Sequence, residues 1–423
     1  MSVTTATGHA NRRLAIRCGG VLDVESGEVR ADRVLHVADG RIRAEATPTE
    51  GVPDEAVVID LGGLTILPGL LDTHTHLVGD VQTADVPSTM TSAAEDVLLG
   101  VRHARQTIEA GFTTVRDLGP FRAFADCALR DAIDRGDVVG PRMQCAGAFI
   151  TVPWGGGAVV GLAPDIRLPE DLRFGAVTNP DEVRDRVRRL LIGGANVIKC
   201  IGTGAVLARG GVPGAPELSE AEIRAAVDEA RWYNAYVAVH AHGAEGAKRA
   251  IRAGARSVEH GSYLDDEAIA MLVDTGTFYT ADMYDGVWAL EHGEIEGWPA
   301  ETMRKMRESQ ESIEVVLAKA VDAGVRIVFG TDSGVYPHGL NGRQFAVYAR
   351  FGMSPLAAIR SATIEAAECL GWGDRVGTLA PGRFADVVAV DGDPLADLTV
   401  LERPVVVLKG GDVAMDRRGV AVA

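Results

Sequence analysis

The sequence predicts an α/β protein: a (β/α)8 TIM barrel with a small β-sandwich that both ends of the chain build together. Residues 66–377 alternate strand-like apolar runs with helical patterns, which is typical of a parallel α/β barrel. Residues 1–65 and 378–423 contain short apolar runs separated by Gly and Asp turns, which favours an antiparallel sheet. A chain of 423 residues is long enough for one large barrel and an accessory domain.

The two ends of the chain share a β-rich pattern. Residues 13–62 are typical of an antiparallel β-meander, because turn pairs such as Gly19-Gly20 and Asp39-Gly40 separate their apolar runs. Residues 386–390 and 405–409 form two more apolar runs near the C-terminus. Because the middle of the chain lacks this pattern, we expect the two ends to pack together as the sandwich.

Eight strands are predicted in the central region, at residues 66–73, 112–117, 142–147, 196–201, 235–241, 256–260, 277–283 and 325–331. The helices between them carry start and stop signals. Asn179 and Ser219 are typical N-caps, and one helix is predicted to open at Ser354 and close at Gly371. Eight strands in strict alternation with helices indicate a barrel whose chemistry lies at the C-terminal ends of the strands.

Composition argues against several classes of function. The 59 acidic and 42 basic residues give a net charge of −17, which disfavours nucleic acid and anionic membrane surfaces as partners. The five scattered cysteines form no CxxC motif, a pattern typical of reduced proteins. Since the sequence also shows neither a membrane-length apolar run nor a signal peptide, we expect a cytoplasmic protein.

A histidine pair follows the first predicted strand of the barrel. His74 and His76 lie just beyond the apolar run 64–71, and side chains two residues apart on a strand point to the same face. Two imidazoles on one face at the end of a buried strand make half of a metal site. The pair alone leaves a second interpretation open, in which one histidine is a core residue and the other lies on the surface.

Four other predicted strands carry residues that can bind a metal: Lys199 on the fourth, His240 and His242 on the fifth, His260 on the sixth and Asp332 on the eighth. Taken singly, a His or Asp at a strand end is more often a cap or turn residue than a ligand. Lys199 is different, because a lysine inside a buried apolar run is rarely tolerated as a structural residue. Since all of these residues fall at the same rim of one barrel, the sequence favours a shared metal site.

The set of metal-competent residues resembles that of the amidohydrolase superfamily, in the order His74-x-His76, Lys199, His240, His260 and Asp332. A sandwich built from both termini matches the same superfamily. Four segments further resemble its imidazolonepropionase-like branch, which includes prolidases and carboxypeptidase-like dipeptidases: residues 68–76, 111–117, 258–261 and 330–339. The similarity spans essentially the whole chain, and it is far more specific for the superfamily than for a substrate.

The resemblance implies a centre of two divalent metal ions, usually zinc. The lysine on the fourth strand is carboxylated in such enzymes and bridges the metals, because burial beside cations favours a neutral amine that can add carbon dioxide. By position, one metal would bind His74, His76, Lys199 and Asp332, and the other would bind Lys199, His240 and His260. Asp332 would accept a proton from the attacking water and pass it to the leaving amine, so Asp332 and Lys199 are the predicted catalytic residues.

Residues on the rim are candidates for contact with the substrate. His242 shares the face of His240, and the resemblance implies that it touches the substrate; the alternative is a supporting hydrogen bond within the site. Tyr284 follows the seventh strand, and Tyr336 and His338 follow the eighth. Their place on the rim makes them further candidates.

A glycine-rich loop at residues 151–161 departs from the family pattern. Several relatives carry a Gly-Gly-His segment here, whereas in this chain Trp154 precedes three glycines and no His follows them. A phosphate-binding loop is rejected, because no Lys-Ser/Thr pair follows the glycines. We predict a mobile rim loop, with Trp154 as a substrate contact.

The sequence thus predicts a metal-dependent hydrolase that cleaves an amide or peptide bond of a small substrate, either an Xaa–amino-acid dipeptide or an N-acyl amino acid. One alternative is another hydrolase of the superfamily, acting on a cyclic amide, imide or lactone, or an imidazolonepropionase or deaminase. Lys199 counts against the mononuclear members among these. A non-catalytic scaffold is the other alternative, which the complete ligand set disfavours. The resemblance also implies a homo-oligomer.

Overall fold

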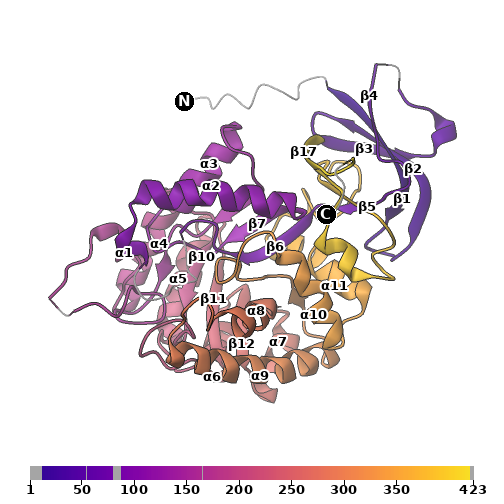
Figure 1. Ribbon diagram of the computed structural model, residues 1–423. Helices are drawn as coiled ribbons and strands as arrows, with labels where there is room; N and C mark the ends of the chain where they lie inside the picture. Colours follow the sequence, from indigo (N-terminus) through magenta and orange to yellow (C-terminus); the bar gives the residue numbers. More distant parts are fainter. Residues whose placement is uncertain (1–11, 54, 80–86, 164, 420–423) are drawn as a thin grey trace.

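The computed structural model describes residues 12–53, 55–79, 87–163 and 165–419. Figure 1 shows a region of helices around parallel strands and, beside it, a separate sheet. That sheet contains the first strands of the chain, in indigo, and the last strands, in yellow. The protein is therefore of the α/β class.

Eight strands from both ends of the chain form the separate sheet, called the terminal sheet below. Their order is β17-β16-β15-β5-β1-β2-β3, with β4 also paired to β1. The strands are β1 (Arg13–Leu22), β2 (Val29–Ala38), β3 (Arg41–Ala46), β4 (Val57–Asp60), β5 (Thr65–Pro68), β15 (Val387–Val390), β16 (Val406–Lys409) and β17 (Asp412–Asp416). The pairing of β15 with β5 joins the two ends of the chain through backbone hydrogen bonds.

The meander predicted for residues 13–62 is confirmed only for its first three strands. β1, β2 and β3 are antiparallel neighbours, whereas β4 and β5 run parallel to β1. The reason is the length of β1, because its N-terminal half pairs with β4 and its C-terminal half pairs with β5. The antiparallel prediction is therefore wrong for β4.

Parallel strands form two further sheets, in the orders β6-β7-β8 and β14-β13-β12-β11-β10-β9. The strands are β6 (Leu70–Thr75), β7 (Phe112–Asp117), β8 (Arg142–Cys145), β9 (Phe149–Ile150), β10 (Ile198–Ile201), β11 (Val237–Gly243), β12 (Ser257–Tyr263), β13 (Phe278–Thr280) and β14 (Ile327–Val328). The strand predicted at residues 66–73 is split between β5 and β6. Gly69 lies at the split, where an added Cβ atom would come within 2.1 Å of Thr113 Oγ1.

Twelve α-helices are found in the described ranges: α1 (Pro87–Met90), α2 (Ala93–Glu109), α3 (Ala125–Arg135), α4 (Pro180–Ile192), α5 (Glu220–Arg231), α6 (Ala244–Ala253), α7 (Asp266–Thr275), α8 (Tyr284–His292), α9 (Ala300–Asp322), α10 (Gln344–Arg350), α11 (Pro355–Ser361) and α12 (Ile364–Cys369). The caps predicted at Asn179 and Ser219 are confirmed, because their side chains accept the first free N–H groups of α4 and α5. None of the described helices is both long and apolar enough to cross a membrane.

The single helix predicted from Ser354 to Gly371 is instead two helices, α11 and α12. The carbonyl groups of the linking residues are engaged by the parallel strands. Phe329 N–H donates to Ser361, and Leu71 N–H donates to Ala362, at 3.0 and 2.8 Å. The backbone leaves helical geometry at Thr363, with φ of −132° and ψ of −96°, so the helix stops and restarts.

Candidate active site

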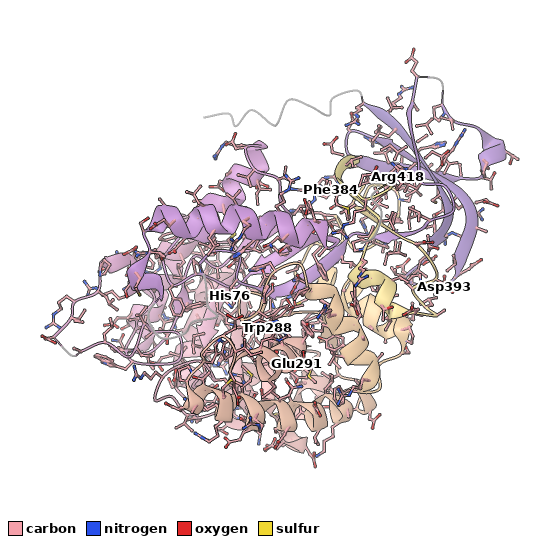
Figure 2. The ribbon with its side chains drawn as sticks, in the orientation of Figure 1. His76, Trp288, Glu291, Phe384, Asp393 and Arg418 are labelled. Carbon is pink, nitrogen blue, oxygen red and sulfur yellow. The ribbon has the colours of Figure 1, made fainter. Side chains whose placement is uncertain are left out.

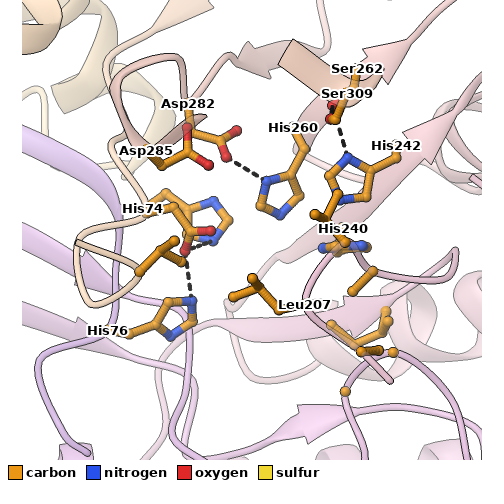
Figure 3. Close-up of a pocket in the computed structure, with 18 of the residues that line it drawn as sticks. His74, His76, Leu207, His240, His242, His260, Ser262, Asp282, Asp285 and Ser309 are labelled. Carbon is orange, nitrogen blue, oxygen red and sulfur yellow. Dashed lines mark hydrogen bonds and ion pairs between the residues drawn. The ribbon is translucent and has the colours of Figure 1, made fainter. Parts of the chain in front are cut away.

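One pocket gathers all the predicted metal ligands, and Figure 3 labels the four histidines among them. They come from β6 and the residue that follows it, from β10, β11 and β12, and from the segment that follows β14. The ligands that line the pocket are His74, His76, Lys199, His240, His260 and Asp332, and His242 lies among them. Parallel strands thus bring residues from distant parts of the sequence to one edge.

The ring orientations of His74 and His76 are fixed through their Nδ1 atoms. Nδ1 of His76 donates to the Gly119 carbonyl at 2.8 Å, and Nδ1 of His74 donates to Glu259 Oε2 at 3.0 Å. In a neutral ring, Nε2 then carries a lone pair. These Nε2 atoms lie 3.5 Å (His74) and 3.1 Å (His76) from Asp332 Oδ1. Two lone pairs and a carboxylate oxygen this close together need a proton or a metal cation between them, and this donor set fits a divalent metal.

Asp332 is held over these histidines by an unusual backbone. Its φ of 52° lies in the left-handed region, which a non-glycine residue adopts only where the surrounding structure enforces it. Its N–H donates to the carbonyl of His74 at 2.8 Å, which ties the loop after β14 to β6. Burial opposes ionisation, but His74 and His76 hold the pKa of Asp332 well below its usual range. Asp332 is therefore a carboxylate.

Lys199 lies on β10 with 2% of its surface exposed. Its Nζ atom is 3.5 Å from Nε2 of His74, its single hydrogen-bond contact within the described part of the chain. Burial lowers the pKa of Lys199 to about 8, so the neutral amine is accessible close to neutral pH. The lysine is thus both buried and reactive, beside the first histidine of the site.

Three histidines from β11 and β12 form the other side of the site. One ring nitrogen from each of His240, His242 and His260 lies within 4.8 Å of the others. Nδ1 of His260 donates to Asp282 Oδ2 at 2.8 Å, which leaves its Nε2 free to bind a metal. Nδ1 of His242 lies 2.9 Å from Ser262 Oγ. His240, His242 and His260 could thus hold a metal together, and His242 also lies where a substrate in the pocket could touch it.

The histidines of the site differ in pKa. Burial lowers the pKa of His74 to about 3 and that of His260 to about 4, and it lowers the pKa of His240 and His242 well below the ordinary value. Burial also opposes protonation of His76, but the Asp332 carboxylate outweighs it and raises the pKa of His76. A proton therefore competes with a metal most strongly at His76.

A buried ion pair beneath the site has no assigned role in the sequence-based prediction. Glu259 and Arg116 have no exposed surface, and Arg116 Nη2 donates to Glu259 Oε1 at 2.8 Å. The other oxygen of Glu259 accepts from His74. Although burial opposes it, Arg116 and His74 hold the pKa of Glu259 below its usual range. The sequence feature that could have revealed this ion pair is a charged residue inside each of two largely apolar strands, Arg116 on β7 and Glu259 on β12.

Two acidic residues beyond β13 line the pocket as well, and the sequence-based prediction missed both. Asp282 fixes the ring of His260, and Asp285 lies in the first turn of α8. Figure 3 shows both carboxyl groups at the wall of the pocket. Burial, followed by the neighbouring carboxylates, raises the pKa of each well above the ordinary value. Neither follows a recognisable motif, because β13 is short and its end cannot be placed from an apolar run.

The predicted contact at Trp154 is not part of the described lining of the pocket. Its side chain is 70% exposed, because the loop turns through a φ of 65° at this residue and directs the indole to solvent. The glycines that follow do line the pocket, at Gly156 and Gly157. Glu217 accepts the N–H of Gly156 at 2.9 Å, which fixes this loop against the segment before α5.

Tyr284, Tyr336 and His338 are also absent from the described lining. Tyr284 packs edge-to-face on Tyr336, within a buried apolar cluster beside the pocket. His338 stacks on His103 with 4.2 Å between ring centroids. Their place after β13 and β14 was predicted correctly, but packing turns these side chains into neighbouring clusters.

Fold and site together define a class: an α/β protein with a buried cluster of histidines and carboxylates at the C-terminal ends of parallel strands. The profile of the Amidohydrolase family matches residues 65–414. Ochratoxinase from Aspergillus niger is 33% identical over 372 residues, which cover 82% of this chain and 75% of that enzyme. The chain therefore belongs to the amidohydrolase family.

Solved structures agree with this assignment. A Xaa-Pro dipeptidase with methionine bound in its active site superposes with a TM-score of 0.88 at 35% identity, covering 95% of this chain and 99% of the dipeptidase. A prolidase in complex with N-methylphosphonate-L-proline gives 0.88 at 29% identity, with coverage of 95% and 99%. The prediction of a prolidase-like amidohydrolase is confirmed, as is hydrolysis of an amide or peptide bond in a small substrate.

Proposed function

We propose that this chain is a two-metal hydrolase of Xaa–amino-acid dipeptides or N-acyl amino acids. The observation that carries the proposal is the donor set of the pocket, in which imidazole nitrogens and carboxylate oxygens converge. Membership of a family that is generally metal-dependent supports it. Similarity to a Xaa-Pro dipeptidase and to ochratoxinase supports the choice of a small substrate.

The ligands divide between two sites. Zinc is the proposed metal, because imidazole and carboxylate donors suit it. One ion would be held by His74, His76, Lys199 and Asp332, and the other by Lys199, His240 and His260. The hydrogen bonds of His76 Nδ1 to Gly119 and of His260 Nδ1 to Asp282 support two separate metal sites. In each ring they leave the Nε2 lone pair free on the opposite side, one for each metal.

Lys199 would bridge the two ions as N6-carboxylysine. Its position beside His74 and its lowered pKa support this role, because the neutral amine is the form that adds carbon dioxide. The resulting carbamate is an anion, and it would balance the charge of two cations in a buried site. Uncarboxylated, the same lysine would leave the charge of the two cations without this balancing anion.

Bound metal ions would supply Lewis acidity, which acidifies water and polarises the carbonyl of the substrate. Asp332 has a carboxylate against both histidines of β6, so it is placed to accept the proton of the attacking water and return it to the leaving nitrogen. His242, anchored on Ser262, is placed to orient the substrate. Apolar walls that include Phe149 would exclude bulk water from the site.

Substrate class can be tested with a panel of dipeptides, N-acyl amino acids and lactones, assayed with zinc and bicarbonate supplied. We expect hydrolysis of dipeptides or N-acyl amino acids with apolar side chains, because apolar residues form much of the wall: Phe121, Phe149, Val160, Ile201, Leu207, Met306 and Ile313. Hydrolysis of lactones alone would replace this proposal with the alternative of a lactone hydrolase.

The metal centre can be tested apart from the substrate. Elemental analysis should give two equivalents of metal per chain, and protein equilibrated with 13C-bicarbonate should show a carbamate resonance by NMR. Lys199→Ala should lose that resonance and bind less metal. A full complement of metal in Lys199→Ala would contradict the bridging role.

We also infer that the parallel strands close into one (β/α)8 barrel. Support comes from bonds across both gaps between the sheets: Thr73 N–H donates to Phe329 at 2.8 Å, and Asn196 N–H donates to Cys145 at 3.0 Å. The terminal sheet would fold over as the small sandwich. Ile42 N–H donates to Arg383 at 2.9 Å, which supports contact of the β3 edge with the segment before β15.

A further inference from the structure

Asp285 is an unpartnered carboxyl group in the wall of the pocket. It lies in the first turn of α8, and only 9% of its surface is exposed. Its Oδ1 atom has no hydrogen-bond partner in the described part of the chain. A buried acceptor without a donor costs free energy, so such a group is expected either to meet a ligand or to bind a proton.

The surroundings of Asp285 supply more acceptors. An added Cβ atom at Gly286 would lie 2.0 Å from Gln310 Oε1, so this glycine lets the side chain of Gln310 approach α8 closely. Nε2 of Gln310 donates to Glu314 Oε1 at 3.2 Å, which identifies the atom against Gly286 as the carbonyl oxygen. Gln310 lines the same pocket. Asp285 and Gln310 are therefore neighbouring pocket residues that both carry oxygen acceptors, which favour a ligand rich in N–H donors.

The described lining of the pocket contains no arginine, and its single lysine is Lys199. Because Lys199 belongs to the proposed metal centre, no other Lys or Arg of the described lining is left to neutralise Asp285. Apolar side chains, Met306 and Ile313, lie along the same wall. A cationic group on an aliphatic substrate matches this combination of walls and acceptors.

We propose that Asp285, with Gln310, binds an ammonium group of the substrate and makes the enzyme select free amines over their neutral counterparts. The inference rests on the proposed amide hydrolysis and divides its two substrate classes, because an unmodified dipeptide carries an α-ammonium group and an N-acyl amino acid does not. The rival is a structural role, in which a protonated Asp285 donates to the neighbouring carboxylate of Asp282.

Two matched substrate pairs test the selection. Alanyl-leucine and propionyl-leucine differ by the α-ammonium group, whereas propionyl-lysine and propionyl-norleucine differ by a side-chain ammonium group. In the wild type, kcat/KM should be at least about tenfold higher for the charged member than for the neutral member of at least one of the two pairs. A charge-assisted contact is expected to give a difference of this size. Asp285→Asn should abolish this ratio with little change for the neutral member. Glu291→Gln, an exposed acid on the same helix, is the control and should keep it.

Binding is measured in parallel, so that selection is tested apart from turnover. n-Butylamine should raise the melting temperature of wild type more than n-butanol does, and Asp285→Asn should remove the difference. Equal hydrolysis within both pairs, or a ratio that survives Asp285→Asn, overturns the inference and leaves the proposed function standing. If no pair is hydrolysed, Asp285-dependent binding of the amine supports the inference while the proposed function fails. Absence of that binding as well overturns both.

Discussion

The chemistry of this site depends on single hydrogen bonds to the histidine rings, made at Nδ1, the nitrogen opposite the one that could bind a metal. Nδ1 of His76 and of His260 is tied to an acceptor, so each ring keeps one orientation and one tautomer. Asp332 completes the cluster from a left-handed backbone position, which its bond to His74 enforces. The site is thus preorganised, and single substitutions should separate its functions.

Substitution of Asp332 by Asn should abolish most turnover while metal binding persists in part. The amide keeps an oxygen for coordination but cannot accept a proton, and loss of general base catalysis costs about 100-fold to 10,000-fold in rate. The measurement is kcat together with metal content by elemental analysis. Unchanged kcat would remove Asp332 from the catalytic role.

Metal affinity should fall as the pH decreases through the raised pKa of His76. A metal binds only the neutral ring, so protons compete as soon as His76 protonates, whereas His74 stays neutral down to its pKa of about 3. Competition titrations with a chromophoric chelator at pH 8, 7 and 6 would measure this. His76→Asn should bind more weakly with a flatter pH dependence; an equally steep profile in that variant would assign the proton to another group.

Substitution of Glu259 by Gln should destabilise the protein by about 3–5 kcal/mol, because it leaves the buried charge of Arg116 uncompensated. Urea unfolding of the apoprotein would give the value without a contribution from metal. Arg116→Met in the Glu259→Gln background should recover part of the loss, as a double-mutant cycle for a buried pair requires. Additive losses in the double variant would mean that the two charges act independently.

At the scale of elements, strands deliver the ligands and loops finish the pocket. β6, β10, β11 and β12 each carry a metal-competent side chain, so the register of the strands places most of the donor set. The wall opposite them depends on loops, chiefly residues 151–161 and the segment before α5. A carboxylate, Glu217, connects these two segments through Gly156.

Glu217→Ala should loosen the glycine-rich loop without unfolding the protein. Loss of the bonds to Gly156 is worth about 1 kcal/mol, so amide exchange at Gly156 should accelerate about fivefold. Hydrogen exchange followed by mass spectrometry or NMR would report it. Glu170→Ala, which removes an exposed acid nearby, is the control. Equal protection of Gly156 in both variants would show that the loop is held by other contacts.

At the scale of the whole molecule, the terminal sheet and the parallel strands are one packed unit (Figure 2). Leu67 and Val388 of the terminal sheet share a buried core with Leu70 and Phe112 of the parallel strands. An ion pair reinforces this contact, because Arg142 of β8 donates to Asp386 at 2.9 Å. Shared burial predicts that both parts unfold together.

Asp386→Ala should lower the free energy of unfolding by about 2–4 kcal/mol. It removes the partner of Arg142 and leaves the buried N–H of Gly410 without an acceptor. Urea unfolding, monitored by circular dichroism and tryptophan fluorescence, should stay a single transition at a lower midpoint. Separate transitions in the wild type would show instead that the terminal sheet folds on its own.

The sequence by itself determined the α/β class, most strand positions and the residues that gather in the site. Those features depend on local patterns: apolar runs of strand length, caps such as Asn179, and metal-competent residues at or near the ends of predicted strands. Such patterns survive folding, because the C-terminal ends of parallel strands must meet at one edge.

Only the tertiary structure decided which side chains face the pocket and which groups support it. Tyr284 and His338 lie after the expected strands, yet packing turns them away, whereas Asp285 lies within the same helix turn as Tyr284 and faces the pocket. The split of the helix at Ser361 also involves tertiary contacts, because distant strands bond to the carbonyl groups of the linking residues. The direction of a side chain and its hydrogen-bond partners depend on contacts between residues far apart in the sequence, and no local pattern encodes these contacts.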